Sequence, residues 1–242
     1  MHKSTTIFFS LLFLFSVSTK SQSILFSKPN AAYMKSYTKG IVHLISSPVK
    51  CNTTQMITAG LCAQTTLMLL QQDAHIKNWI QQNRNSTLDK IGNVVKPLGN
   101  GLVMSGTCAA TYISGALFKN EKLKNFGLQS LKSIAISSAV VGGVKMLSGR
   151  PRPYQSNDPL AWAGPLQNLD NRSFFSGHAT FSFSMASSIN IASKKKFWGI
   201  AAYTLASCVA LSRMENNHHW SSDVFFGACM GTAMTYCLWN NN

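Results

Sequence analysis

Apolar residues are grouped along this 242-residue chain in long segments that lack the apolar–polar alternation of half-buried strands. The segments are rich in Ala, Leu, Met, Gly and Ser, and each is long enough for several helical turns. They predict helices at residues 53–71, 99–118, 124–147, 179–193, 197–213 and 220–238. We therefore expect an all-α protein, a helical bundle of about six helices.

One stretch interrupts this helical pattern between residues 148 and 177. It contains four prolines and two glycines that break regular structure, namely Gly149, Pro151, Pro153, Pro159, Gly164 and Pro165. A loop of this length inside a compact helical domain is usually functional. The stretch is therefore the first place to look for a site.

The N-terminus differs from the rest of the chain. Within residues 1–23, Lys3 precedes an apolar run from Ile7 to Val17, and small residues follow, as in a secretory signal peptide. An uncleaved membrane anchor is the alternative interpretation. Residues 24–50 are polar and predict an exposed, irregular lead-in, and residues 51–242 form the expected helical domain.

Two locations fit the helical segments. Residues 97–118 and 224–242 carry no charge and are close to membrane-spanning length, whereas the mean hydropathy of +0.05 is low for a polytopic membrane protein. Lysine clusters at residues 119–124 and 194–196 separate successive helices. If both clusters face the cytoplasm, the proline-rich loop faces the other side. A soluble bundle whose lysines form a solvated face fits the same pattern.

Charge and cysteine usage narrow the function. The chain has 22 Lys+Arg against 7 Asp+Glu, a net charge of +15, yet only 12% of its residues are charged. The low charge content argues against disorder, and the few acids argue against a two-metal carboxylate site. No basic stripe interleaved with aromatic residues indicates a nucleic-acid partner. The six cysteines form no CxxC pair, so a zinc or redox motif is not supported, and their pairing stays open.

Five residues in three separate segments suit the binding of an anion. Lys145, Arg152 and Arg213 are cations, and arginine offers a rigid fork for phosphate oxygens. Ser176 and Gly177 stand just before a predicted helix, where backbone N–H groups favour an anion. A phosphoryl group in transfer spreads charge over three oxygens and needs several such donors.

Three further residues suit the transfer itself. His219 and Asp223 are four residues apart, so on a helix they share one face. A carboxylate that holds one imidazole nitrogen leaves the other free as a nucleophile. His178, next to Gly177, is then available to protonate a leaving oxygen as general acid.

Together the segments resemble the type 2 phosphatidic acid phosphatase superfamily, which includes bacterial non-specific acid phosphatases and vanadium haloperoxidases. Its pattern is K-x6-R-P, then P-S-G-H, then S-R-x5-H-x3-D, and the likeness covers about residues 95–240. The first and third motifs match fully; in the second, Phe175 replaces proline. The spacing selects Arg152 over Arg150 and His219 over His218.

The resemblance implies a helical bundle of the acid phosphatase and haloperoxidase type and a metal-independent phosphatase without a cofactor. Lys145, Arg152 and Arg213 would bind the phosphate, together with Ser176 and Gly177. His219 would form a phosphohistidine, oriented by Asp223, and His178 would protonate the leaving group. The expected substrates are phosphate monoesters or pyrophosphates, with a membrane lipid as the expected carrier.

The expected location is outside the cytoplasm, either in the periplasm or in the inner membrane with the active site facing the periplasm. A soluble periplasmic acid phosphatase of broad specificity is the first alternative function. A vanadate-dependent haloperoxidase and a non-catalytic anion-binding protein are alternatives of other classes. The sequence does not specify the natural substrate.

Overall fold

The computed structural model describes residues 26–165, 172–193 and 195–240, and within these ranges the chain is helical with no strand. The predicted signal or anchor at residues 1–23 lies outside the described residues. The helices are α2 (Ala31–Ser46), η1 (Ser47–Val49), α3 (Thr53–Gln82), α4 (Ser86–Val95), η2 (Lys96–Gly99), α5 (Gly101–Leu117), α6 (Glu121–Ser148), α7 (Gly177–Ala192), α8 (Lys196–Glu215) and α9 (Ser221–Asn240). The all-α prediction is confirmed.

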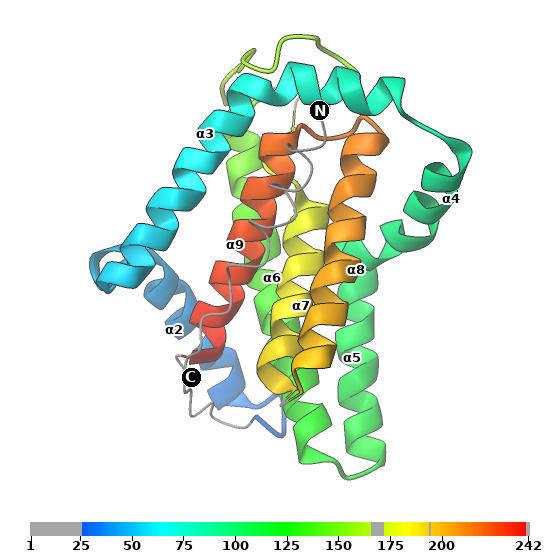
Figure 1. The fold of residues 1–242 in the computed structure, drawn as a ribbon. Coiled ribbons are helices and arrows are strands. Elements are labelled where there is room, and N and C mark those ends of the chain that lie inside the picture. The colour runs from blue at the N-terminus through cyan, green and yellow to red at the C-terminus, as the bar shows by residue number, and fades with distance from the viewer. Residues whose placement is uncertain (1–25, 166–171, 194, 241–242) are drawn as a thin grey trace.

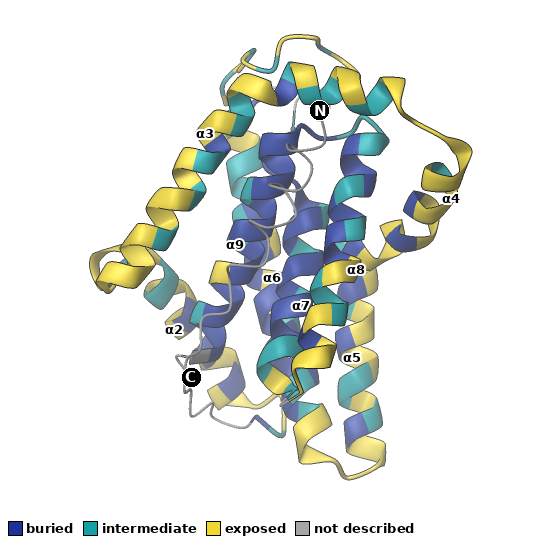
Figure 2. Ribbon diagram, viewed as in Figure 1, coloured by how far each residue is buried: buried dark blue, intermediate teal, exposed yellow. Residues whose placement is uncertain are grey.

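Helix α7 lies at the centre of an upright bundle and packs against α6, α8 and α9 (Figure 1). The central helices are buried along most of their length, whereas α3 and α5 expose long faces (Figure 2). The core between α7, α8 and α9 is built mostly of small side chains, namely Ala179, Ala186, Ala206, Ala210 and Ala228, with Phe183, Met214 and Val224. Small residues let the helix backbones approach closely.

Two glycines of α9 make that approach very close. A Cβ atom at Gly231 would lie 2.2 Å from the carbonyl oxygen of Thr180, and one at Gly227 would lie 2.6 Å from that of Ser176. Neither position accepts a side chain without a shift of the backbone. The register of α9 along α7 is therefore set by direct contact between their main chains.

The N-terminal region corrects one expectation. The lead-in expected to be irregular over residues 24–50 contains α2, capped by Asn30, whose side chain accepts a hydrogen bond from the Tyr33 amide. The Tyr33 hydroxyl donates to the main-chain oxygen of Leu128 on α6 at 2.8 Å. Most of the remaining α2 residues are exposed, and only a few positions pack against the bundle. The sequence pattern therefore did not predict this helix.

Helix α3 is longer than the sequence pattern predicted, ending at Gln82 instead of residue 71. Its polar second half crosses the ends of α9 and α8 rather than packing along an apolar groove (Figure 1). The chain then returns through α4, which the sequence pattern also missed; Asn85 caps this helix. The polar half of α3 is thus placed over the end of the bundle where the motif residues lie.

Apolar residues on the outer helices bear on the membrane question. In the described part of the chain, only α6 is both long and apolar enough to cross a membrane, and 39% of its most apolar stretch is buried. The shorter apolar helix α5 and its C-capping residue together expose five large apolar side chains, namely Leu102, Val103, Ile113, Leu117 and Phe118. Soluble monomers rarely expose contiguous apolar patches of more than a few hundred Å².

Candidate active site

The three motif segments come together at one end of the bundle, where four helices begin or end. Lys145 is in the last turn of α6 and Arg213 in the last turn of α8, whereas Ser176 caps the start of α7. His219 precedes α9, and Asp223 is in its first turn. Residues 149–165, which follow α6, pass over the same end (Figure 1).

The two arginines of this site, Arg152 and Arg213, have buried N–H groups that lack a hydrogen-bond acceptor. Among the described residues, Nε of Arg152 and both Nε and Nη1 of Arg213 have no hydrogen-bond partner. Buried polar groups in native proteins are nearly always paired, so such donors indicate a ligand with acceptor oxygens. Lys145 is held beside them, because its Nζ donates to the carbonyl oxygens of Arg172 at 2.5 Å and Ser173 at 3.2 Å.

The start of α7 adds uncharged donors. The Ser176 amide donates to the carbonyl oxygen of Asp223 at 3.0 Å, which ties the start of α7 to the first turn of α9. The Ser176 hydroxyl accepts a hydrogen bond from the Ala179 amide, so its own proton remains available for donation. Gly177 is the first residue of the helix, where the N–H groups and the helix dipole favour an anion.

His219 and Asp223 lie next to each other but are linked through a third residue. Nδ1 of His219 is 3.6 Å from Oδ2 of Asp223, longer than a hydrogen bond. The Ser173 hydroxyl donates to that Oδ2 at 2.5 Å and lies 3.4 Å from the same Nδ1. The Trp220 amide also donates to Oδ2, at 3.0 Å. The carboxylate is therefore fixed on the side that faces the imidazole.

The surroundings set the charge of these two groups. Burial alone would raise the pKa of Asp223, but His219 and the Arg150 guanidinium lower it to about 2. Burial lowers the pKa of His219 to about 3; Asp223 opposes this shift, and Lys145 and Arg152 add to it. At neutral pH the site therefore holds an ionised Asp223 beside a neutral imidazole, which is the form needed for nucleophilic attack.

The other two histidines of the site differ in their contacts. His178 is in the first turn of α7, and burial followed by the charge of Arg213 lowers its pKa to about 3. His218 has its Nδ1 3.4 Å from Nη1 of Arg152 and packs edge-on against Tyr154. The structure thus sets His218 against an arginine and His219 beside the carboxylate, as the motif spacing predicts.

Three residues of this network were missed by the sequence reasoning. Arg150, set aside in favour of Arg152, is fully buried, and its Nη1 donates to Oδ1 of Asp223 at 2.5 Å. Its Nη2 donates to Oδ2 of Asp73 on α3 at 2.7 Å. The third is Ser173. Two signals were present, a second Arg-Pro pair at Arg150 and the scarcity of acids, but nothing in the sequence marked Ser173.

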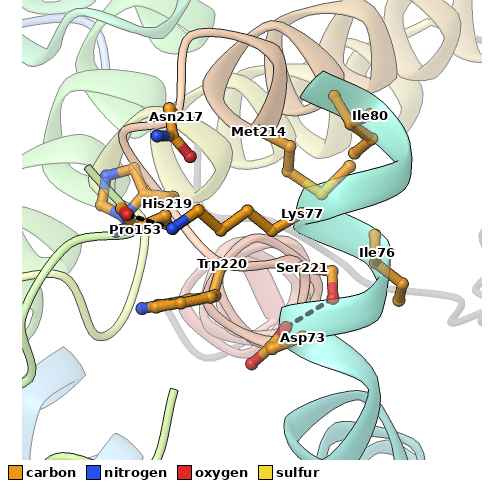
Figure 3. Close-up of a pocket in the computed structure, with 10 residues that line it drawn as sticks. All are labelled: Asp73, Ile76, Lys77, Ile80, Pro153, Met214, Asn217, His219, Trp220 and Ser221. Carbon is orange, nitrogen blue, oxygen red and sulfur yellow. Dashed lines mark hydrogen bonds between the residues drawn. The ribbon is translucent and has the colours of Figure 1, made fainter. Parts of the chain in front are cut away.

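A small cleft lies beside the site, between α3 and the turn that joins α8 to α9 (Figure 3). His219 and Trp220 line one side of the cleft, and Lys77 extends across it from α3. Nζ of Lys77 donates to the carbonyl oxygens of Pro153 and Ser156, at 2.5 and 3.1 Å. Helix α3 thereby holds the loop against the site. No three His, Cys, Asp or Glu side chains gather as a metal site in the described ranges.

Comparison with known families gives the class of this fold and site. Residues 126–242 match the family model of the PAP2 superfamily. The resemblance carried by the three motifs is therefore confirmed. Helices α2 to α5 precede the matched region.

Two of the proteins that resemble this chain are named as phosphatases of lipid phosphates. A lipid A 1-phosphatase of Porphyromonas gingivalis is 34% identical over 114 residues, which is 45% of this chain and 22% of that protein. This chain therefore spans about a fifth of that relative's length. Two crystal structures share the fold: LpxE of Aquifex aeolicus (TM-score 0.50, 22% identity, 69% of this chain and 93% of that one) and a transmembrane PAP2-type phosphatidylglycerolphosphate phosphatase of Bacillus subtilis (TM-score 0.53, 16% identity, 85% and 93%).

Proposed function

We propose that this protein is a metal-independent phosphatase that hydrolyses phosphate monoesters or pyrophosphates carried on a lipid. The observation that carries the proposal is the group of buried guanidinium donors without acceptors on Arg152 and Arg213, beside a neutral His219. A phosphoryl group supplies the missing acceptor oxygens, and Lys145, Ser176 and Gly177 lie at the same end of the bundle.

The first chemical step would transfer the phosphoryl group to the protein. Nε2 of His219 attacks the phosphorus while Asp223 holds the opposite side of the ring, and the bond from phosphorus to the leaving oxygen breaks. The charge of the bound phosphate raises the pKa of His178 above its low value of about 3. His178 is then protonated in the substrate complex and gives its proton to that oxygen, so the alcohol or phosphate leaves uncharged at the broken bond. Arg152 and Arg213 stabilise the charge on the three phosphoryl oxygens.

The second step would return the site to its starting state. His178, now neutral, takes a proton from a water molecule as the water attacks the phosphohistidine. The bond between phosphorus and His219 breaks, and its electron pair returns to the imidazole. Inorganic phosphate leaves with the new oxygen, and His178 is protonated again for the next cycle.

A lipid carrier is supported by the surface and by the relatives. The exposed apolar faces of α3 and α5 suit contact with acyl chains, and the named relatives are phosphatases of lipid phosphates (Figure 2). We propose an inner-membrane location with the site facing the periplasm, reached by export through residues 1–23 acting as a signal or anchor. Residues 51–242 would form the catalytic domain.

A substrate panel tests the proposal. Purified protein would be given phosphatidate, an isoprenoid pyrophosphate, a lipid A-type phosphate and a soluble nucleotide, with phosphate release measured against the His219→Ala variant. We expect at least one lipid substrate to be hydrolysed much faster than the nucleotide. Comparable rates on all four would support the alternative, a broad-specificity acid phosphatase, and no release from any of them would refute the phosphatase proposal.

A further inference from the structure

A buried chain of three charged groups connects helix α3 to the proposed catalytic pair. The Arg150 guanidinium lies between two carboxylates, with Nη1 2.5 Å from Asp223 and Nη2 2.7 Å from Asp73. None of the three side chains exposes any surface to solvent. Two acids flank one cation here, so the charge of Arg150 is shared between them.

Arg150 has little freedom to move. Its Nε and Nη2 donate to the carbonyl oxygen of Pro159 at 3.1 and 2.9 Å, and Nη1 also donates to the Ser222 hydroxyl. The guanidinium carbon lies 5.1 Å from the ring centre of Trp162 and 5.5 Å from that of Trp220. A guanidinium with these partners is held in one orientation and holds Asp223 in turn.

Asp73 also binds the first turn of α9 directly. Its Oδ1 accepts hydrogen bonds from the Ser221 hydroxyl at 2.5 Å and the Ser222 amide at 2.9 Å (Figure 3 shows the first). Its Oδ2 accepts from the Ser222 hydroxyl. A carboxylate from α3 therefore caps the N-terminus of α9, where an anion is favoured by the helix dipole. Asp223 lies in the same turn.

We propose that Asp73 is a positioning residue of the active site, acting through Arg150 and the first turn of α9 to fix Asp223 beside His219. The inference rests on the proposed function and deepens it. Asp73 lies outside residues 126–242, the region that matches the superfamily. The catalytic unit of this protein would therefore include α3, which carries no motif.

A positioning role for Asp73 predicts a different effect on kcat than a role that only anchors α3 to the bundle. Asp73 has hydrogen bonds to Arg150, Ser221 and Ser222, and none of these is one of the three proposed phosphate-binding cations. Loss of its charge should leave the binding of the phosphate group intact and slow the transfer step. Loss of an anchor alone should instead lower stability without a specific effect on kcat.

The first experiment compares Asp73→Asn with Gln81→Leu. Gln81 is a matched control because it anchors α3 to the carbonyl oxygens of Met214 and Glu215 on α8, apart from the Arg150 network. Both variants are assayed for kcat and KM on the best substrate, for inhibition by vanadate, and for thermal unfolding. We expect Asp73→Asn to lower kcat about 10- to 100-fold, which is the loss found when a residue that hydrogen-bonds to a metal-ligating side chain is removed. KM and the vanadate inhibition constant should stay within about twofold of the wild type. Gln81→Leu should keep kcat.

A second set of variants separates the role of Asp73 from a loss of folding. Arg150→Met and the double variant Asp73→Asn with Arg150→Met are measured alongside Asp73→Glu. If Asp73 acts through Arg150, the double variant loses no more kcat than Arg150→Met alone, and Asp73→Glu recovers part of the activity. The double variant removes both charges of the Asp73–Arg150 pair, so neither is left buried without its partner. It therefore tests the inference even where Asp73→Asn does not fold.

The outcomes are distinct. An active wild type with unchanged kcat in Asp73→Asn would overturn the positioning role and leave the proposed function in place. Multiplicative losses in the double variant would overturn the route through Arg150. Equal losses in Gln81→Leu and Asp73→Asn would also overturn it, in favour of anchoring. A wild type that hydrolyses none of the four substrates would overturn the proposed function and this inference together.

Discussion

Nδ1 of His219 lies 3.6 Å from Oδ2 of Asp223. The Ser173 hydroxyl contacts both atoms. The carboxylate thus contacts the imidazole partly through an intermediary, and catalytic hydrogen bonds in enzymes often shorten only when substrate is bound. We therefore expect substitutions of His219, Asp223 and Ser173 to lower activity by different amounts.

His219→Ala should abolish phosphate release from an aryl phosphate, because it removes the proposed nucleophile. Asp223→Asn should cost less, about 10⁴-fold in kcat as for the orienting aspartate of a catalytic triad, since it orients and does not attack. Steady-state phosphate release from both variants, together with protein-bound phosphate measured after quenching in alkali, where a phosphohistidine is stable, checks both expectations. Retained turnover in His219→Ala would refute the nucleophile assignment.

Ser173→Ala should lower kcat about 10- to 100-fold, from the loss of a hydrogen bond to a charged group worth about 1.5–3 kcal/mol. The matched control is Ser137→Ala on α6, because the Ser137 hydroxyl is buried and has no partner in the described part of the chain. Steady-state kinetics of both variants provide the measurement. A loss in Ser137→Ala as large as that in Ser173→Ala would indicate a general packing effect.

Vanadate should inhibit competitively, and a chelator should not inhibit. The predicted inhibition follows from the cations Lys145, Arg152 and Arg213, which would bind vanadate as they bind phosphate. Arg213→Lys should weaken vanadate inhibition about 10-fold or more, because lysine lacks the planar fork. Inhibition constants measured with and without EDTA test this, and activity lost in EDTA and restored by a divalent ion would contradict the metal-independent mechanism.

Acid should destabilise the folded protein. Burial lowers the pKa values of His178 and His219 to about 3 and that of His218 to about 4, against about 6.5 in the unfolded chain. The unfolded chain binds more protons below pH 6.5, so this stability is full above 6.5 and is lost as the pH falls toward 3.

Thermal unfolding measured from pH 7.5 to 4 at constant ionic strength checks this dependence. Inorganic phosphate should raise the unfolding midpoint more at pH 5 than at pH 7.5, because a bound anion raises the pKa values of the nearby histidines. His219→Gln should flatten the pH dependence. A midpoint that is constant from pH 7.5 to 4 in the wild type would show that the histidines titrate normally.

Breaking the ion pairs of Arg150 should be costly for folding. Arg150→Ala leaves both Asp73 and Asp223 buried without their cation, and removal of one partner of a buried pair typically costs about 3–5 kcal/mol. Denaturant unfolding measures the loss. Arg84→Ala is the control, because Arg84 pairs with Asp89 at the surface, where such pairs contribute about 0–1 kcal/mol.

The sequence pattern predicted the helices whose boundaries are set by interactions between residues close in sequence. Breaks in the apolar segments predicted the helices from α5 to α9 to within a few residues. Helices α5, α6 and α7 each begin at a capping asparagine or serine, which is a local signal. Helix α2 was missed, because its burial comes from a few contacts such as Tyr33 with Leu128.

The motif residues gather at one end of the bundle as their positions at predicted helix ends suggested, although their roles remain predictions. Asp73 and Ser173 could not be found in the same way. Their partners lie 50 or more residues away or across the proline-rich loop, and only the tertiary structure brings them to Asp223. Arg150 was visible as a motif-like pair, but spacing alone could not show that it faces carboxylates.

The close contact of Gly231 with Thr180 and of Gly227 with Ser176 has a consequence for phosphoryl transfer. His178 and Asp223 belong to the two helices that meet there, and His219 directly precedes one of them. The main-chain positions of the proposed acid and the proposed nucleophile are thereby fixed relative to each other by direct backbone contact. In the proposed mechanism, the packing of α9 on α7 would therefore set the distance that an in-line displacement must span.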